Sequence, residues 1–249
     1  MICLTTLFLF IFHYGIHSFC NYYIPQYQTI SNQQSMSKQQ HFICQDVISI
    51  CMSSVVCFLF FIELISYNNI FNIHERWNQK ISTTIHMSFS MLVSNSLYEL
   101  VLYLLFGKKL TFYIHHILVC LIYSWSLYLQ ELSFFLCLCG FVEITNIFLC
   151  TITILSRLQL REQYKKVYQC MGIGLYLSYL ITRVIMFLCS FLLFIYDLLY
   201  YPNLTIMTHH VVYLCFVVIA FLLLYTMSFY WFLIIHEKLR KRLKHYKYG

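Results

Sequence analysis

Long apolar runs separated by short polar breaks dominate the sequence. The runs cover residues 4–19 and about 43–67, 81–106, 112–129, 132–155, 171–199 and 207–235. Most of them match the about 20 residues that a helix needs to cross the hydrocarbon core of a bilayer, and they lack the period-two alternation of strands. A helix also satisfies its backbone groups within its own segment. The pattern predicts an all-α fold, a polytopic transmembrane helical bundle with six to seven spans.

The N-terminal run has two interpretations. Residues 4–19 lack the positive n-region and the A-x-A-like cleavage site of a secretory signal, so a first transmembrane helix is favoured over a signal peptide. The following stretch, up to residue 40, is rich in Gln, Ser and Asn and predicts a flexible loop. We therefore divide the chain into an N-terminal segment (1–40), a transmembrane domain (41–236) and a basic tail (237–249).

Two details of the span ends can be predicted. The run 171–199 is long enough to tilt, or to break near Asp197. Trp77 and Trp231 lie near the ends of predicted spans, where amphipathic rings are enriched at the membrane surface. We expect both indoles in an interfacial aromatic belt.

Composition agrees with the membrane assignment and adds an orientation. The 249 residues are 61% hydrophobic and 10% charged, against roughly 25% charged residues in a soluble domain. The net charge of +7 resides in the breaks and the tail, which favours a membrane surface over nucleic acid as the partner. With seven spans and a cytosolic tail, thirteen of the sixteen Lys and Arg residues fall on the cytosolic side. A cytosolic C-terminus and a lumenal N-terminus are therefore expected.

The twelve cysteines do not indicate a metal site. They fall in or beside apolar runs, without CxxC or zinc-type spacing, so reduced thiols that pack in the protein are expected. Cys137 and Cys139 are two residues apart, and such positions do not share a helix face. Glu-x-x-His spacing of the di-iron type is also missing. We expect neither a metal nor another cofactor.

Candidate chemistry comes from five polar residues inside the apolar runs: Glu99, His115, His116, Glu143 and Arg183. A charged group at mid-helix costs roughly 2.5 to 3.5 kcal/mol on insertion scales, so such groups persist where they face protein or a polar cavity. Isolated polar residues at Asp46, Glu63 and His86 are better explained by helix packing.

The depth of these five residues follows from the turns between the helices. Around a turn near residues 130–131, His116 and Glu143 differ in depth by about 3 Å at 1.5 Å per residue. Glu99 and the two histidines are nearly level around the break at 107–109, and so are Glu143 and Arg183 around residue 163. The five residues should share one layer, with Glu143 or Glu99 as the partner of Arg183. The alternative is a set of ion pairs that only fixes helix packing.

The order of several motifs from Trp77 to Phe232 resembles the TLC-domain (TRAM/LAG/CLN homology) membrane protein family. The motifs are WNQKISTTIH at 77–86, YEL at 98–100, HHILVCLIYSWSLY at 115–128, FVEITNIFL at 141–149, the single Arg183, and FYWF at 229–232. The resemblance implies a helical lipid-handling protein of the endoplasmic reticulum.

Within that family, the sequence looks closer to the TLC-domain-containing branch than to the ceramide synthases. Ceramide synthases pair the two histidines with a D-x-x-D motif, whereas the corresponding positions here are Glu143 and Asn146. Three positions depart from the TLC-domain-containing branch as well: Ile147, Cys150 and Ser228.

Three functions remain open at this point. In the first, the protein takes part in membrane lipid homeostasis by binding or regulating a lipid, whose head group contacts Glu99, His115, His116, Glu143 and Arg183. The second is a ceramide-synthase-like N-acyltransferase that uses acyl-CoA. His115 or His116 would be the base or acyl acceptor and Glu143 would position it, since imidazole exchanges protons near neutral pH. The third is a lipid transporter or trafficking receptor. Membrane lipids are the expected partners, and the oligomeric state is left open.

Overall fold

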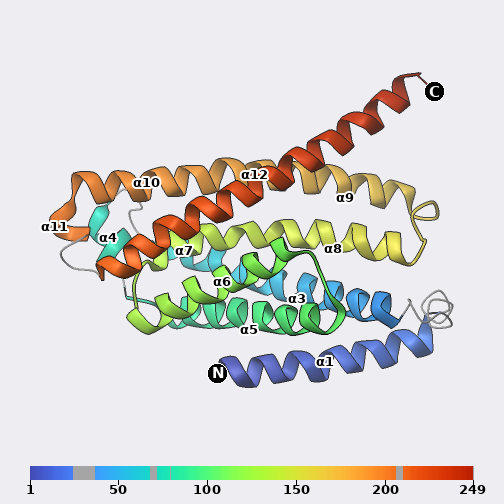
Figure 1. Ribbon diagram of the computed structural model, residues 1–249, viewed down its shortest axis with the longest axis horizontal. Coiled ribbons are helices and arrows are strands. Elements are labelled where there is room, and N and C mark those ends of the chain that lie inside the picture. The colour runs from blue at the N-terminus through green and yellow to red at the C-terminus, as the bar shows by residue number, and fades with distance from the viewer. Residues whose placement is uncertain (25–36, 68–71, 79, 206–209, 249) are drawn as a thin grey trace.

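The computed structural model describes residues 1–24, 37–67, 72–78, 80–205 and 210–248, and the described residues form helices and connecting turns (Figure 1). Seven helices are long and apolar enough to cross a membrane, which confirms the predicted all-α polytopic bundle. The elements are α1 (Ile2–Tyr23), α3 (Ser37–Ser66), α4 (Ile73–Asn78), α5 (Thr83–Phe106), α6 (Leu110–Leu129), α7 (Ser133–Gly140), η1 (Phe141–Glu143), α8 (Ile144–Arg157), α9 (Lys165–Ser178), η2 (Tyr179–Met186), α10 (Phe187–Tyr200), α11 (Pro202–Thr205) and α12 (Val211–Tyr248).

Two of the seven spans contain an irregular segment. The fifth span runs from α7 to α8 through η1, a single 3₁₀ turn, and the sixth runs from α9 to α10 through η2, a π-helix. The sixth span continues to Tyr200, so the predicted break near Asp197 is wrong. The irregularity, η2, lies about three to five turns earlier. Short π-helical segments inside α-helices often occur at functional sites.

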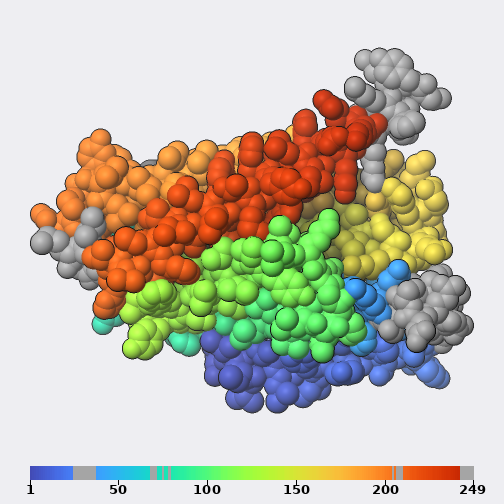
Figure 2. All heavy atoms as spheres, viewed as in Figure 1, coloured from blue at the N-terminus to red at the C-terminus, as the bar shows by residue number. Residues whose placement is uncertain are grey.

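Six of the spans form a closed ring. Going around it, α3 contacts α5, α5 contacts α6, α6 contacts α12, α12 contacts η2, α9 contacts α8, and α8 contacts α3. The remaining span, α1, packs on the outside of α3 and α5, along one edge of the molecule (Figure 2). Large aromatic side chains, including Phe60, Phe89 and Phe135, are buried together in the hydrophobic core.

A buried ion pair holds the short helix α4 at one end of the ring. The Arg76 guanidinium donates to the carboxylate of Asp197 at 2.9 and 2.6 Å, and the Trp77 indole N–H donates to the same carboxylate at 2.8 Å. Trp77 is only 2% exposed and stacks on Phe194, so its prediction as an interfacial belt residue is wrong. The indole is buried because Asp197 supplies an acceptor inside the protein, so the N–H need not reach water.

The cysteines in the described part of the chain are free thiols. Cys137 and Cys139 are both buried in the aromatic core, and the Cys137 thiol donates to the backbone oxygen of Phe60 at 3.6 Å. Among the described residues, no group of His, Cys, Asp and Glu side chains has the arrangement of a metal site.

Candidate functional site

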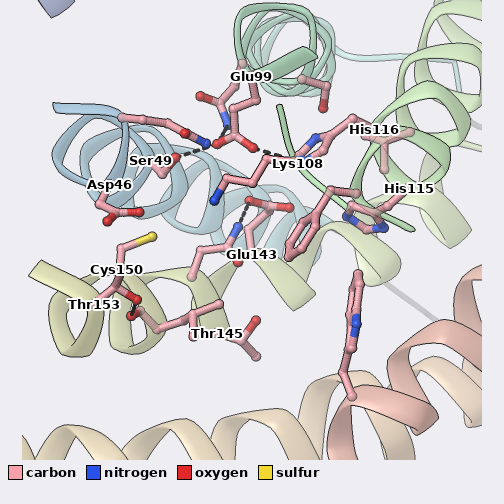
Figure 3. Close-up of a pocket in the computed structure, with 18 of the residues that line it drawn as sticks. Asp46, Ser49, Glu99, Lys108, His115, His116, Glu143, Thr145, Cys150 and Thr153 are labelled. Atoms are coloured by element: carbon pink, nitrogen blue, oxygen red, sulfur yellow. Dashed lines mark hydrogen bonds and ion pairs between the residues drawn. The ribbon is translucent and has the colours of Figure 1, made fainter. Parts of the chain in front are cut away.

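A cavity of about 390 Å³ lies at the centre of the helix ring (Figure 3). Its walls include side chains from all six helices of the ring and from the turn between α5 and α6. The five polar residues singled out from the sequence, Glu99, His115, His116, Glu143 and Arg183, all line this cavity. Their predicted convergence is therefore confirmed. The volume of the cavity falls in the range of about 300 to 1,000 Å³ typical of small-molecule sites.

Glu99 is the most heavily hydrogen-bonded acid of the cavity. One carboxylate oxygen accepts from the Ser49 hydroxyl at 2.5 Å, and the other accepts from the Tyr103 hydroxyl at 3.2 Å and lies 3.0 Å from His116 Nε2. Tyr103 is one helical turn after Glu99, so both side chains face the same side of α5. The acid that orients a histidine is therefore Glu99, and the acid predicted for that role, Glu143, is not within ion-pair distance of the described histidines.

Among the described residues, three buried atoms on the cavity wall have no hydrogen-bond partner: the Tyr179 hydroxyl, His116 Nδ1 and Asn95 Oδ1, one turn before Glu99. Because the Glu99 carboxylate can only accept, His116 Nε2 carries the proton of that contact, and neutral His116 presents Nδ1 as an acceptor. His116 Nδ1 and Asn95 Oδ1 are thus two acceptors that a ligand with O–H or N–H groups would fill.

His115 has different surroundings from its neighbour, as expected for adjacent helical residues about 100° apart. Its ring packs edge-on against Trp231 of α12, with centroids 5.7 Å apart, and Trp231 stacks on Phe112. Trp231 is half-buried and lines the cavity. His115 therefore joins α6 to the aromatic wall formed with α12.

Glu143 lies where η1 interrupts the fifth span. Its carboxylate accepts from the Ser53 hydroxyl of α3 at 3.0 Å and from the Asn146 amide at 2.8 Å. Asn146 is three residues later on the same helix face, so the Glu143-Asn146 pair is a local hydrogen bond that fixes the carboxylate. The carboxylate is held toward α3 in this way.

Arg183 lies in the π-helix η2, and the prediction of an acidic partner for it is wrong. Its Nε donates to the Thr145 hydroxyl at 2.9 Å, and its guanidinium packs over the Tyr179 ring at 5.2 Å. Within the described residues, no carboxylate lies within ion-pair distance of it. The physical reason is the direction of Glu143, whose Oε2 accepts from both Ser53 and Asn146 and so holds the carboxylate toward α3.

The end of the cavity nearest the C-terminus is basic, and the sequence reasoning missed its residues. The Lys108 side chain points into the cavity, and its ammonium lies 4.0 Å from the centre of the Phe42 ring (Figure 3). Arg157 donates to Asp46 at 2.5 Å, and exposed Lys238 lines the same end. Burial, and then the positive charge of Arg157, lower the pKa of Lys108. Asp46 thus has a place in the cavity beyond the packing role expected for it.

The opposite end of the cavity is apolar. A smaller space of about 40 Å³ adjoins the first and shares His115, Glu143 and Arg183 with it. Most of its other lining residues are hydrophobic, among them Phe187 and Phe221. From the basic end inward, the site therefore passes from cationic to mixed polar to apolar, which is the polarity gradient of an amphipathic molecule.

The chain matches the model of a known protein family. The family model of the TLC domain matches residues 42–237, which is most of the chain and includes all or most of every helix of the ring. Among curated proteins, none matches the chain.

Proposed function

Because the chain belongs to the TLC-domain family, we propose that it binds an amphipathic membrane lipid in the central cavity and acts in membrane lipid homeostasis through that binding. The head group would lie among Glu99, His115, His116, Glu143 and Arg183, and an apolar part would reach toward the smaller space at Phe187 and Phe221.

The observation that carries this proposal is the pair of empty acceptors, His116 Nδ1 and Asn95 Oδ1, on the wall of a cavity enclosed by membrane-spanning helices. A buried acceptor without a partner costs about 1 to 3 kcal/mol, and buried polar atoms in native proteins nearly always have one. A ligand with hydroxyl or N–H groups would supply it. Among molecules that enter a bilayer, lipids with such head groups meet this requirement.

The experiment is native mass spectrometry of the protein purified in a mild detergent. Wild-type protein should carry lipid, and Asn95→Leu, which removes one empty acceptor and keeps the branching of the side chain, should lower the bound fraction at least tenfold. Ser90→Ala is the matched control, since Ser90 is also buried on α5 with an unpartnered hydroxyl but does not line the cavity. Empty wild-type protein, or full occupancy in Asn95→Leu, would refute the proposal.

A second candidate function, N-acyl transfer from acyl-CoA, is favoured by one specific arrangement. Glu99 holds His116 through Nε2 and leaves Nδ1 available as a general base, as in carboxylate-imidazole pairs of hydrolases. An amine that attacked the thioester carbonyl would form the C–N bond and lose its proton to Nδ1. The C–S bond would break, and the coenzyme A thiolate would take up the proton as it left.

This candidate needs a test of its own. Purified protein given acyl-CoA and a long-chain base should form an N-acylated product, His116→Ala should abolish it, and Glu99→Gln should reduce kcat by about 10²-fold or more by leaving the imidazole unoriented. Folded wild-type protein without product would remove acyl transfer and leave lipid binding intact.

We also propose that the basic end faces the cytosol and that the protein resides in the endoplasmic reticulum. The turns at 107–109 and 158–164 lie at the same end of the molecule as the C-terminus (Figure 1). Lys108, Lys109, Arg161 and the basic part of α12 gather there, which follows the positive-inside rule. Protease protection of a C-terminal tag in sealed microsomes tests the orientation, and a protected tag would reverse it.

A further inference from the structure

Three histidines meet outside the central cavity, where α1 packs on α3 and α5. His13 of α1 is 2% exposed, with Nδ1 2.6 Å from the Tyr98 hydroxyl and Nε2 2.9 Å from Nδ1 of His41 on α3. The His17 ring also stacks on His41, with centroids 5.2 Å apart. These three imidazoles, His13, His17 and His41, are called the histidine cluster below.

The contact between His13 and His41 limits how many protons the two rings can hold. A hydrogen bond between ring nitrogens needs one N–H and one bare nitrogen. In the neutral pair, either Tyr98 O–H donates to His13 Nδ1 and His13 Nε2–H donates to His41 Nδ1, or both hydrogen bonds run in the opposite direction. One added proton can be held on His41, whose Nδ1–H would donate to His13 Nε2. Protonation of both rings would set two N–H groups against each other at 2.9 Å and place two positive charges beside the His17 ring.

The surroundings offer little to stabilise that added charge. The segment α1 has no acidic residue, and the nearby carboxylates of α3 and α5, Asp46 and Glu99, face the cavity and are paired with Arg157 and His116. The other titratable or charged groups on the three packed helices and the adjoining turn, taken from the described residues at this end, are Tyr14, Cys20, Tyr22, Tyr23, Lys38, Cys44, Tyr98, Tyr103, Lys108 and Lys109. The three lysines are cations and oppose a further positive charge.

Polar contacts have unusual weight in the docking of α1. Lipid tails are as apolar as leucine, so helix association inside a bilayer depends on close packing and hydrogen bonds rather than on hydrophobic burial. Side chains such as Leu4, Phe8 and Ile11 on the outer face of α1 are exposed and would contact lipid, docked or not. The His13 contacts to Tyr98 and His41 distinguish the docked helix from a detached one.

We propose that the histidine cluster is a proton-binding site that controls the docking of α1, which is docked while at most one of His13 and His41 is protonated and is released when both are. Imidazole titrates between about pH 5 and 8, so the transition belongs in that range. Tyr98 and Glu99 are neighbours on α5, one facing α1 and the other the cavity. Release of α1 would therefore uncover the wall that carries Glu99.

A photocrosslinker in place of Phe10 tests this, because the Phe10 ring lies edge-on to Tyr98 with centroids 5.1 Å apart. With p-benzoylphenylalanine at position 10, crosslinks to α5 in lipid nanodiscs should fall at least tenfold between pH 7.5 and pH 5. In the His13→Gln/His41→Gln variant, whose amides hydrogen-bond at either pH, the yield should not change with pH. His86→Gln, an exposed histidine at the other end of α5, should behave like wild type.

Two results would overturn the proposal: a wild-type yield that is independent of pH, or a pH dependence that survives in the double variant. If the double variant gives no crosslink even at pH 7.5, His17→Gln decides. This variant leaves the His13-His41 contact in place and removes an imidazole whose protonation would oppose docking. Docked α1 should therefore tolerate more acid, and the midpoint of the crosslink loss should move to lower pH. An unmoved midpoint would then refute the role of the cluster.

Discussion

Removing Asp197 should strongly destabilise the protein, because this carboxylate joins α10 to α4. It accepts three hydrogen bonds, two from Arg76 and one from the Trp77 indole, and the side chains of the ion pair are 5% and 0% exposed. Breaking a buried ion pair by deleting one partner costs about 3 to 5 kcal/mol. We expect Asp197→Ala to lower the free energy of unfolding by that amount.

The structure also predicts how the two sides of the pair combine. In Asp197→Ala the guanidinium of Arg76 remains buried without its carboxylate, whereas the double variant Arg76→Met/Asp197→Ala leaves no buried charge. The double variant should therefore be more stable than the sum of the single effects, with a coupling of about 2 kcal/mol or more between neighbours in contact. Trp77, which stacks on Phe194, reports the transition by its fluorescence during SDS titration in mixed micelles.

A matched control is the exposed pair of Glu237 and Lys241, one turn apart on α12, with side chains 55% and 71% exposed. Glu237→Ala should leave the unfolding midpoint unchanged, since exposed pairs contribute little. Strict additivity of the Arg76 and Asp197 effects, or a loss below about 1 kcal/mol in Asp197→Ala, would refute the buried-pair reasoning.

Three further predictions use the same titration. Gly140→Ala should cost about 1 to 3 kcal/mol, because an added Cβ would lie 2.0 Å from a ring carbon of Phe60, whereas Gly172→Ala, with nothing within 4 Å, should be neutral or slightly stabilising. Arg157→Met should cost about 2 kcal/mol, less than the Asp197 change because Arg157 is 21% exposed. The lowered pKa of Lys108 means that folding disfavours its charged form, so wild-type stability should gain a contribution as pH rises toward the ordinary lysine pKa of about 10.4, and Lys108→Met should lack that gain.

The spans and the depth of the polar residues in the membrane could be predicted because both follow from counting residues along the chain. An apolar run of about 20 residues fixes a span, and a rise of 1.5 Å per residue fixes depth once the turns are short. The turn at 130–132 is short in the structure, with Gln130 in the left-handed region, so His116 and Glu143 do line one cavity.

The partners of those residues could not be predicted, because they depend on rotation about each helix axis. The 3₁₀ turn at η1 and the π-helix at η2 change the residues per turn at the positions of Glu143 and Arg183. The regular helical period therefore does not predict which way side chains point beyond such segments. This is why Arg183 was expected to meet an acid and instead meets Thr145.

The basic end was missed for a different reason. Lys108 and Arg157 lie at the ends of spans, where the sequence assigns cations to the membrane surface, and Asp46 was treated as isolated. A signal was present: an acid two turns inside the apolar helix α3 needs a partner, and Arg157 is the last residue of α8, which packs beside it. Pairing acids with cations at span ends, as well as at mid-span, would have found it.

The empty acceptors separate lipid binding from a role in packing alone. Suppose that Glu99, His116 and Asn95 served only to hold α5 against α6. The unpartnered His116 Nδ1 and Asn95 Oδ1 would then each destabilise the folded protein by about 1 to 3 kcal/mol without a compensating function. Asn95→Leu should then stabilise the protein and change nothing else. If the acceptors bind a lipid, Asn95→Leu should again have a higher unfolding midpoint than wild type in lipid-free detergent. Added lipid should then stabilise wild type but not the variant, because a ligand stabilises only the state that binds it.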